Sequence, residues 1–130
     1  MFKKTKLLVL DVDGVMTDGG IYFGSNNIIL RKFNVQDGVG IDLLHNYGIH
    51  VAIISGGIKA GVVERASKLK IKFCYTGIKN KHKPLLKIQK KLKINSSNTV
   101  FLGDDINDLD VKPYVSHLIS VKNGNIFFKR

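Results

Sequence analysis

The sequence of 130 residues lacks the features of a secreted, membrane-spanning or multidomain protein. Cys74 is the only cysteine, which excludes an internal disulfide and a cysteine-based zinc site and is typical of a reducing compartment. No apolar run approaches the roughly 20 residues that a membrane-spanning helix needs. The chain begins with a basic flank like that of a signal peptide, but Asp11 and Asp13 interrupt the apolar stretch and no cleavage site follows. Without a Pro-rich linker or an internal repeat, we expect one cytoplasmic domain over residues 1–130 that binds no membrane.

Acidic residues are also scarce, since 10 Asp and Glu stand against 21 Lys and Arg, a formal net charge of +11. Such a balance ordinarily favours nucleic acid as a partner. However, no nucleic-acid reading motif is present, and the aromatic residues are not interleaved with the lysines as a base-stacking surface requires. Six of the acids fall in two short clusters: Asp11, Asp13 and Asp18, then Asp104, Asp105 and Asp108. We therefore expect the carboxylates to carry chemistry, and no nucleic-acid partner.

Apolar runs and helical spacings alternate along the chain. Patterns of buried strands cover residues 6–12, 51–55, 72–75, 99–103 and, as a fifth candidate, 118–121. Stretches with helical spacing lie between them, at residues 39–47, 60–69 and 85–92. This alternation predicts an α/β fold, a three-layer, doubly wound, Rossmann-like parallel sheet with right-handed crossovers and helices on both faces.

Two segments interrupt the alternation, and both predict β-hairpins. Residues 19–33, here called the flap, contain short β segments at 21–23 and 28–33 around the turn-forming sequence Gly-Ser-Asn-Asn. Near the end of the chain, Asn123-Gly124 lies between two apolar β runs. The remaining intervals between strands have room for single helices only. The sequence therefore predicts a hairpin flap after the first strand and no cap domain.

The first acidic cluster, DVDGVMTD, directly follows the first predicted strand. Because side chains two residues apart in a strand point the same way, Asp11 and Asp13 can both face the carboxyl edge of the sheet, where ligands bind in open α/β folds. Two carboxylates this close repel each other unless a cation lies between them or one is protonated. Oxygen ligands of this kind favour a hard ion such as Mg²⁺.

The second cluster, GDDIND, follows the strand predicted at residues 99–103. If that strand adjoins the first one, Asp104 arrives at the same edge and completes the ligand set of the metal, with Asp105 and Asp108 just behind. The alternative is that acidic residues cap helices after strands. For Asp108 and Asp18, taken singly, that alternative stays open.

The ends of other strands supply groups that complement a metal and a phosphate. Ser55 offers a hydroxyl, and the amides of Gly56 and Gly57 stand next to a helix N-terminus, where anions bind. Lys81 opens the lysine-rich helix and can bring a positive charge to the same point, although Lys79 and Lys83 compete with it. Together these groups predict a phosphoryl-transfer site. A response-regulator receiver is disfavoured because its acceptor Asp follows the third strand, where this chain has KFCYTG without an Asp.

The motifs DVDGVMTDG, FNVQDGVGIDLL, VAIISG, TGIKNK and GDDINDL occur in the order and spacing of the haloacid dehalogenase superfamily. The chain resembles its capless sugar-phosphate phosphatases over residues 6 to about 109. The resemblance implies that Asp11 is the nucleophile and forms an aspartyl-phosphate. It also implies that Asp13 first protonates the leaving alcohol and then deprotonates the hydrolytic water.

The same resemblance implies the remaining roles. Mg²⁺ would be held by Asp11, by the backbone carbonyl of Asp13 and by Asp104. Ser55, Gly56 and Lys81 would bind the phosphoryl group. The acidic residues expected to orient the metal's surroundings and the lysine are Asp105 and Asp108.

The resemblance also predicts the assembly of the protein. An open, capless site needs walls from elsewhere, and a homotetramer would supply them, with apolar flap residues at the interface: Ile21, Tyr22, Phe23, Ile28 and Ile29. The alternative is that these side chains pack on their own subunit. The sequence departs from the family pattern in two places. Family members usually carry an Arg where this chain has Gly57, and they continue beyond the position of Arg130 through a helix and a Gly-rich basic tail.

The function that we expect is Mg²⁺-dependent hydrolysis of an acidic sugar phosphate, most directly 3-deoxy-D-manno-octulosonate 8-phosphate. One alternative is a phosphatase acting on a nonulosonate 9-phosphate, a sialic acid-like sugar. Another is a non-catalytic assembly domain like the phosphatase-like part of some acylneuraminate cytidylyltransferases, which predicts decayed motifs, whereas those of this chain are complete. The positive surface would attract a substrate that carries both a carboxylate and a phosphate.

Overall fold

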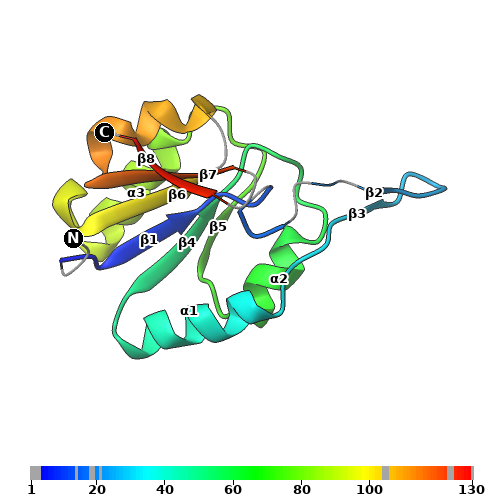
Figure 1. The fold of residues 1–130 in the computed structure, drawn as a ribbon, viewed down its shortest axis with the longest axis horizontal. Helices are drawn as coiled ribbons and strands as arrows, with labels where there is room; N and C mark the ends of the chain where they lie inside the picture. Colours follow the sequence, from blue (N-terminus) through cyan, green and yellow to red (C-terminus); the bar gives the residue numbers. More distant parts are fainter. Residues whose placement is uncertain are drawn as a thin grey trace.

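The first predicted strand, β1 (Leu7–Leu10), lies inside a six-stranded sheet of order β5-β4-β1-β6-β7-β8 (Figure 1). The computed structural model describes residues 4–13, 15–17, 20, 22–103, 106–122 and 125–129, with side chains except those of 106–108 and 121–129. β1 pairs in parallel with β4 (His50–Ile54) on one side and with β6 (Thr99–Gly103) on the other. The predicted adjacency of the strands that precede the two acidic clusters is confirmed.

The outer strands complete the sheet. β5 (Phe73–Tyr75) pairs in parallel with β4, and β7 (His117–Lys122) pairs in parallel with β6, so five strands form the predicted parallel sheet. β8 (Asn125–Lys129) then runs antiparallel to β7. The predicted C-terminal hairpin is therefore present in its two strands, while its Asn123-Gly124 turn lies outside the described residues.

Helices cover both faces of the sheet and give three layers (Figure 1). α1 (Gln36–Asn46) and α2 (Val62–Lys68) pack on one face, and α3 (His82–Leu92) packs on the other. Two 3₁₀ segments complete the second side, η1 (Ser96–Asn98) before β6 and η2 (Ile106–Tyr114) after it. η2 begins inside the second acidic cluster, where the apolar pattern predicted no helix.

The apolar run of β1 serves two separate cores. Leu7 and Val9 point into the core under α3, whereas Leu10 and Val12 point into the core under α1 and α2. Both cores exclude water, since all four side chains are buried. The continuous apolar pattern of this strand is thus explained by burial on both faces, as in other parallel sheets.

Two helix boundaries differ from the predicted ones for local reasons. α2 begins at Val62 rather than at residue 60, because Gly61 has a φ of 74°, in the left-handed region that an α-helix cannot include. α1 begins at Gln36, before the apolar spacing that starts at residue 39, because the side chain of Asn34 accepts the Gln36 N–H at 2.9 Å.

The flap projects away from the body of the protein (Figure 1). Its strands β2 (Tyr22–Phe23) and β3 (Ile29–Leu30) are antiparallel. β3 is shorter than the predicted 28–33, and Phe33 pairs instead with Thr17 in an isolated bridge. Asn26 and Asn27 have φ values of 60° and 62°, as a type I′ turn requires. No cap domain is present in the described intervals between strands, as predicted. None of the helices in the described ranges has the length and apolar character needed to cross a membrane.

Candidate active site

Asp11 occupies the point where β1 ends at the carboxyl edge of the sheet. Its N–H donates to the carbonyl of Leu102 in β6 at 2.9 Å, so the backbone of Asp11 still belongs to the ladder between β1 and β6. One carboxylate oxygen accepts the N–H of Val12 at 2.8 Å, and the residue is only 7% exposed. The carboxylate is thereby fixed at the sheet edge by rigid backbone.

Lys81 is the lysine that faces Asp11. Its Nζ lies 3.4 Å from Oδ2 of Asp11 and 5.9 Å from the ring centre of Phe101, a fully buried residue of β6. Lys81 is itself buried immediately before α3, whereas Lys79 and Lys83 are exposed. Of the three lysines that the sequence left open, the structure brings only Lys81 to the carboxylate.

The loop after β4 brings Ser55 and Gly56 to the same place. The N–H of Ser55 donates to the carbonyl of Tyr75 at 2.8 Å, and the carbonyl of Ser55 accepts the N–H of Ile78 at 3.0 Å. Its Oγ accepts the N–H of Gly57 at 3.1 Å, which leaves the hydroxyl proton to be donated elsewhere. A Cβ on Gly56 would lie 3.8 Å from Cε of Lys81, so this loop touches the stem of the lysine.

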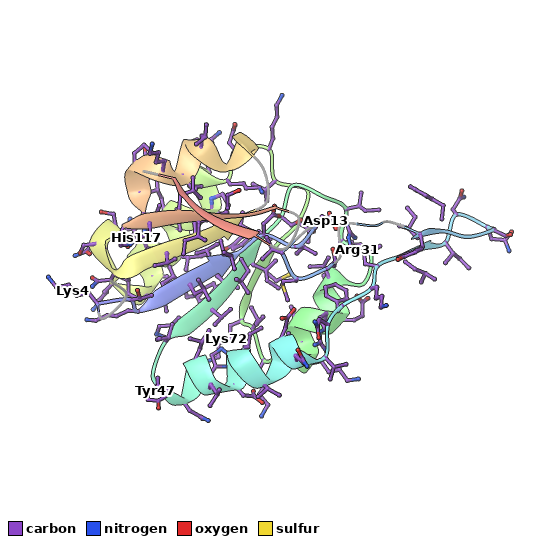
Figure 2. All side chains as sticks on the ribbon, in the orientation of Figure 1. Lys4, Asp13, Arg31, Tyr47, Lys72 and His117 are labelled. Atoms are coloured by element: carbon purple, nitrogen blue, oxygen red, sulfur yellow. The ribbon has the colours of Figure 1, made fainter. Side chains whose placement is uncertain are left out.

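Asp13 is held by a residue that the sequence patterns did not single out. Arg31, at the base of the flap, donates from Nε to Oδ1 of Asp13 at 2.7 Å and from Nη2 to Oδ2 at 3.2 Å (Figure 2). Its Nη1 donates to the carbonyl of Ala60 at 2.8 Å. A lone arginine inside the apolar segment IILRKF was the only signal in the sequence.

Asp110 is a second residue near the site that the sequence patterns did not single out. Its Oδ2 accepts the backbone N–H of His82 at 3.0 Å and lies 2.9 Å from Nδ1 of the same histidine. Because His82 follows Lys81, this contact ties η2 to the start of α3 beside the buried lysine. Asp110 is remote in sequence from α3, so no local pattern indicates this contact.

The second acidic cluster is described only in part. Asp104 and Asp105 lie outside the described residues, as does Asp18. Asp108 belongs by its backbone to η2, and its side chain is outside the description. Within the described ranges no three His, Cys, Asp or Glu side chains are grouped as metal ligands. Two of the three predicted ligands, Asp11 and Asp13, stand together after β1, and their oxygens are the hard donors that suit Mg²⁺.

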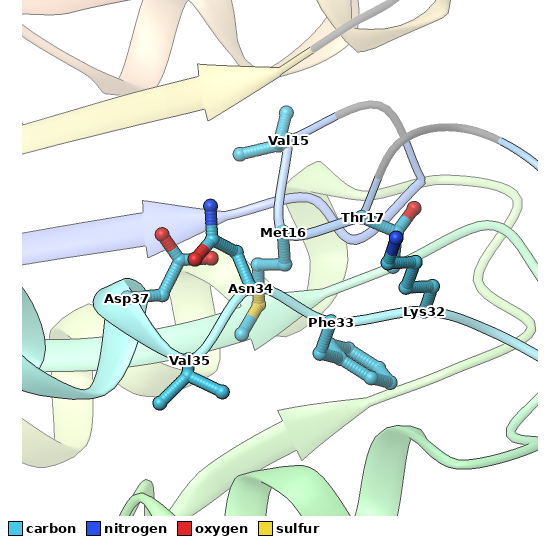
Figure 3. Close-up of a pocket in the computed structure, with 8 residues that line it drawn as sticks. All are labelled: Val15, Met16, Thr17, Lys32, Phe33, Asn34, Val35 and Asp37. Atoms are coloured by element: carbon cyan, nitrogen blue, oxygen red, sulfur yellow. The ribbon is translucent and has the colours of Figure 1, made fainter.

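A cavity of about 570 Å³ adjoins the loop that carries Asp13 (Figure 3). Residues from that loop and from the segment entering α1 line it: Val15, Met16, Thr17, Lys32, Phe33, Asn34, Val35 and Asp37. Burial raises the pKa of the Asp37 carboxyl above its ordinary value, and the nearby Arg65 guanidinium opposes this shift. None of the predicted catalytic, phosphate-binding or metal-binding residues lines the cavity.

Comparison with known proteins gives the family. No family model matches the chain. The 3-deoxy-D-manno-octulosonate 8-phosphate phosphatase of Escherichia coli strain K12 is 39% identical over 120 residues, which are 92% of this chain and 64% of that protein. The phosphatase of the same name from Haemophilus influenzae is 31% identical over 124 residues, 95% of this chain and 69% of that protein. The chain therefore spans slightly less than two thirds of the Escherichia coli protein and slightly more than two thirds of the Haemophilus influenzae protein.

A solved structure shows the same fold. The 3-deoxy-D-manno-octulosonate 8-phosphate phosphatase of Moraxella catarrhalis, in complex with a magnesium ion, a phosphate ion and KDO, superposes with a TM-score of 0.82 at 38% identity. The match covers 88% of this chain and 66% of that one. With a relative that is more than 30% identical and covered over more than two thirds of its length, the chain belongs to the 3-deoxy-D-manno-octulosonate 8-phosphate phosphatase family of the haloacid dehalogenase superfamily.

Proposed function

We propose that this chain forms the catalytic core of a Mg²⁺-dependent phosphatase that hydrolyses 3-deoxy-D-manno-octulosonate 8-phosphate to the free sugar acid and phosphate. The observation that carries the proposal is the buried carboxylate of Asp11, 3.4 Å from the Lys81 ammonium at the carboxyl edge of the sheet. A buried carboxylate beside a lysine ammonium is suited to attack a phosphoryl group whose oxygens that ammonium attracts.

The proposed reaction has two steps on the residues of this chain. Asp11 attacks phosphorus, the bond between phosphorus and the sugar oxygen breaks, and Asp13 gives a proton to that oxygen. Asp13 then takes a proton from water, which attacks phosphorus and releases Asp11 together with inorganic phosphate. Throughout, the Ser55 hydroxyl, the Gly56 amide and the Lys81 ammonium hold the phosphoryl oxygens.

The oxygen donors at the end of β1 fit Mg²⁺, and we assign its binding to Asp11, the backbone carbonyl of Asp13 and Asp104. When bound, the ion neutralises negative charge on the phosphate and on the carboxylates. Asp105 and Asp108 are assigned to orient the ion's surroundings and Lys81.

Two observations support the choice of substrate. The relatives that match this chain carry the name of 3-deoxy-D-manno-octulosonate 8-phosphate phosphatase, and the Moraxella catarrhalis structure holds magnesium, phosphate and KDO. The net charge of +11 also favours the approach of a substrate with two anionic groups.

We further propose that the chain assembles as a homotetramer through the flap. Phe23 is 78% exposed, and Tyr22 and Ile28 are about half exposed, on a hairpin that leaves the body of the protein (Figure 1). None of these three side chains belongs to either core of its own subunit, while Ile29 is partly buried and Ile21 lies outside the described residues. Clustered apolar surface of this kind favours a protein partner, and a neighbouring subunit would wall the open site.

The test is a phosphate-release assay with 3-deoxy-D-manno-octulosonate 8-phosphate, a nonulosonate 9-phosphate and simple sugar phosphates, each with Mg²⁺ and with a chelator. The first substrate should be preferred, and chelation should abolish turnover. Asp11→Asn should lower kcat at least about 1,000-fold, because it removes the nucleophile. Asp42→Asn, on the exposed face of α1, is the matched control. Undiminished turnover by Asp11→Asn would rule out the mechanism, and a tetramer without hydrolysis would favour the assembly-domain alternative.

A further inference from the structure

Arg31 is a cation of the flap whose side chain is completely buried inside the body of the protein. Its guanidinium reaches Asp13 through two hydrogen bonds and the carbonyl of Ala60 through a third. The Asp13 carboxylate keeps 28% of its side-chain surface exposed, whereas Arg31 keeps none. A ligand can therefore approach Asp13 while Arg31 stands behind it, out of reach of the reacting atoms.

Gly57 leaves room for this pair. A Cβ built on Gly57 would lie 2.7 Å from Oδ2 of Asp13 and 2.8 Å from Nη2 of Arg31. Both distances are shorter than van der Waals contact allows, so any side chain at position 57 would displace one member of the pair. The glycine at the position where the family resemblance implies an arginine is thus explained by the place that Arg31 occupies.

We propose that Arg31 is a positioning residue for Asp13, and that the absence of a side chain at Gly57 is what admits it. The inference rests on the proposed phosphatase function. A guanidinium that binds both oxygens of a carboxylate fixes the plane of that group as well as its position. The exposed part of Asp13 is then held where a substrate can reach it, and the orientation of the acid depends on a residue that the flap supplies.

A positioning role and a purely structural role differ in their dependence on the leaving group. A sugar alkoxide leaves only when a proton reaches its oxygen, so cleavage of the phosphorus–oxygen bond requires a well-placed Asp13. p-Nitrophenolate is stable as an anion and leaves without that proton. Because kcat/KM reports the steps up to the first irreversible one, it isolates alcohol release from the later hydrolysis of the phosphorylated Asp11.

The experiment compares kcat/KM for 3-deoxy-D-manno-octulosonate 8-phosphate and for p-nitrophenyl phosphate in the full chain. Arg31→Gln should lose about 10- to 100-fold more on the sugar phosphate than on the aryl phosphate, the range expected from misplacing a general acid. Asp13→Asn should show the same selectivity in stronger form, and Arg31→Lys should restore part of the loss. Gly57→Ala should reproduce the pattern with Arg31 intact.

Arg65→Gln is the matched control. The Arg65 guanidinium donates to the carbonyl of Asn34 at 3.0 Å, so it also attaches the segment between the flap and α1 without touching Asp13. The control should change kcat/KM on both substrates by the same factor. If Arg31→Gln does not fold, as judged by circular dichroism and thermal melting, Arg31→Lys and Gly57→Ala carry the comparison.

Each result decides between the hypotheses. Selective loss on the sugar phosphate in the Arg31 and Gly57 variants supports the positioning role. Equal losses on both substrates, or no loss, in an active protein overturn this inference alone. A wild-type chain that hydrolyses neither substrate with Mg²⁺ overturns the proposed function, and the inference falls with it.

Discussion

The ammonium of Lys81 lies 3.4 Å from the carboxylate of Asp11, and both side chains are buried where β1 meets α3. Little of either side chain reaches bulk water, so the attraction between the two charges is only weakly screened. A metal ion bound at Asp11 would add a second positive charge to the same carboxylate. A substitution in this pair should therefore change both the folding stability and the proposed catalysis.

Lys81→Met should lower the free energy of unfolding by about 3–5 kcal/mol in the presence of a chelator, because it removes the ammonium that lies 3.4 Å from a buried carboxylate. Added Mg²⁺ should recover part of that loss and raise the melting temperature of the variant more than that of the wild type. Loss of a donor to the phosphoryl group should also lower kcat about 100-fold or more. Urea unfolding and phosphate release measure the two effects, with the exposed Lys83→Met as control. Equal Mg²⁺ shifts in both proteins would contradict this account.

Gln89 joins α3 to β6 and to η2 through two hydrogen bonds. Its Nε2 donates to Oγ1 of Thr99 at 3.0 Å and to the carbonyl of Tyr114 at 2.8 Å. Gln89→Leu should destabilise the protein by about 1–3 kcal/mol, because the buried Thr99 hydroxyl and the partly buried Tyr114 carbonyl both lose a donor. Urea titration measures the change, and Lys87→Leu on the exposed side of α3 should shift the midpoint little. An unchanged midpoint for Gln89→Leu would show that water replaces the lost donor.

The flap surface predicts how assembly responds to charge. The double variant Phe23→Asp with Ile28→Asp should dissociate the proposed homotetramer, because it would bury two carboxylates in an apolar interface. Sedimentation velocity should show the smaller species, while circular dichroism stays unchanged since Phe23 and Ile28 belong to neither core. Leu86→Asp, exposed on α3, should leave the assembly intact. A tetramer that survives the double variant would place the interface elsewhere.

The pKa of Asp37 predicts a dependence of stability on pH. Burial raises this pKa above its ordinary value of 3.8, and Arg65 opposes the shift. In the pH window above 3.8 the unfolded chain releases the Asp37 proton before the folded protein does, so this group lowers folding stability as the pH rises. Asp37→Asn should remove that contribution, and the stability of the variant relative to the wild type should increase as the pH rises above 3.8. Urea unfolding at a series of pH values measures this difference in stability, with Asp42→Asn as control. A difference between Asp37→Asn and the wild type that stayed constant with pH would contradict the raised pKa of Asp37.

The sequence was sufficient to predict the sheet and the positions of Asp11, Ser55 and Lys81. In a parallel sheet the residues that follow each strand must meet at one edge, so a strand pattern is enough to bring them together. Lys81 could not be separated from its two neighbours, because the choice depends on which side of the α3 N-terminus faces β1.

Contacts between distant segments had no such local signal. Arg31 reaches Asp13 because the base of the flap folds back beside the loop after β4, a path that no periodicity encodes. Asp110 reaches His82 because η2 packs on the start of α3. Whether an apolar hairpin covers its own core or projects from it is likewise decided by the connections at its base, not by its composition.

The central position of β1 has a consequence for how the chain acquires its structure. Leu7 pairs with His50 on one side and with Thr99 on the other, so both neighbours of the first strand come from much later in the chain. Closing such long loops costs entropy before any contact compensates for it, which favours slow folding. Until β6 joins, β1 has an unpaired edge beside two incomplete cores, and a partly folded chain would expose that edge to other copies. Folding yield, rather than the chemistry of the finished site, should therefore be most sensitive to substitutions in β6.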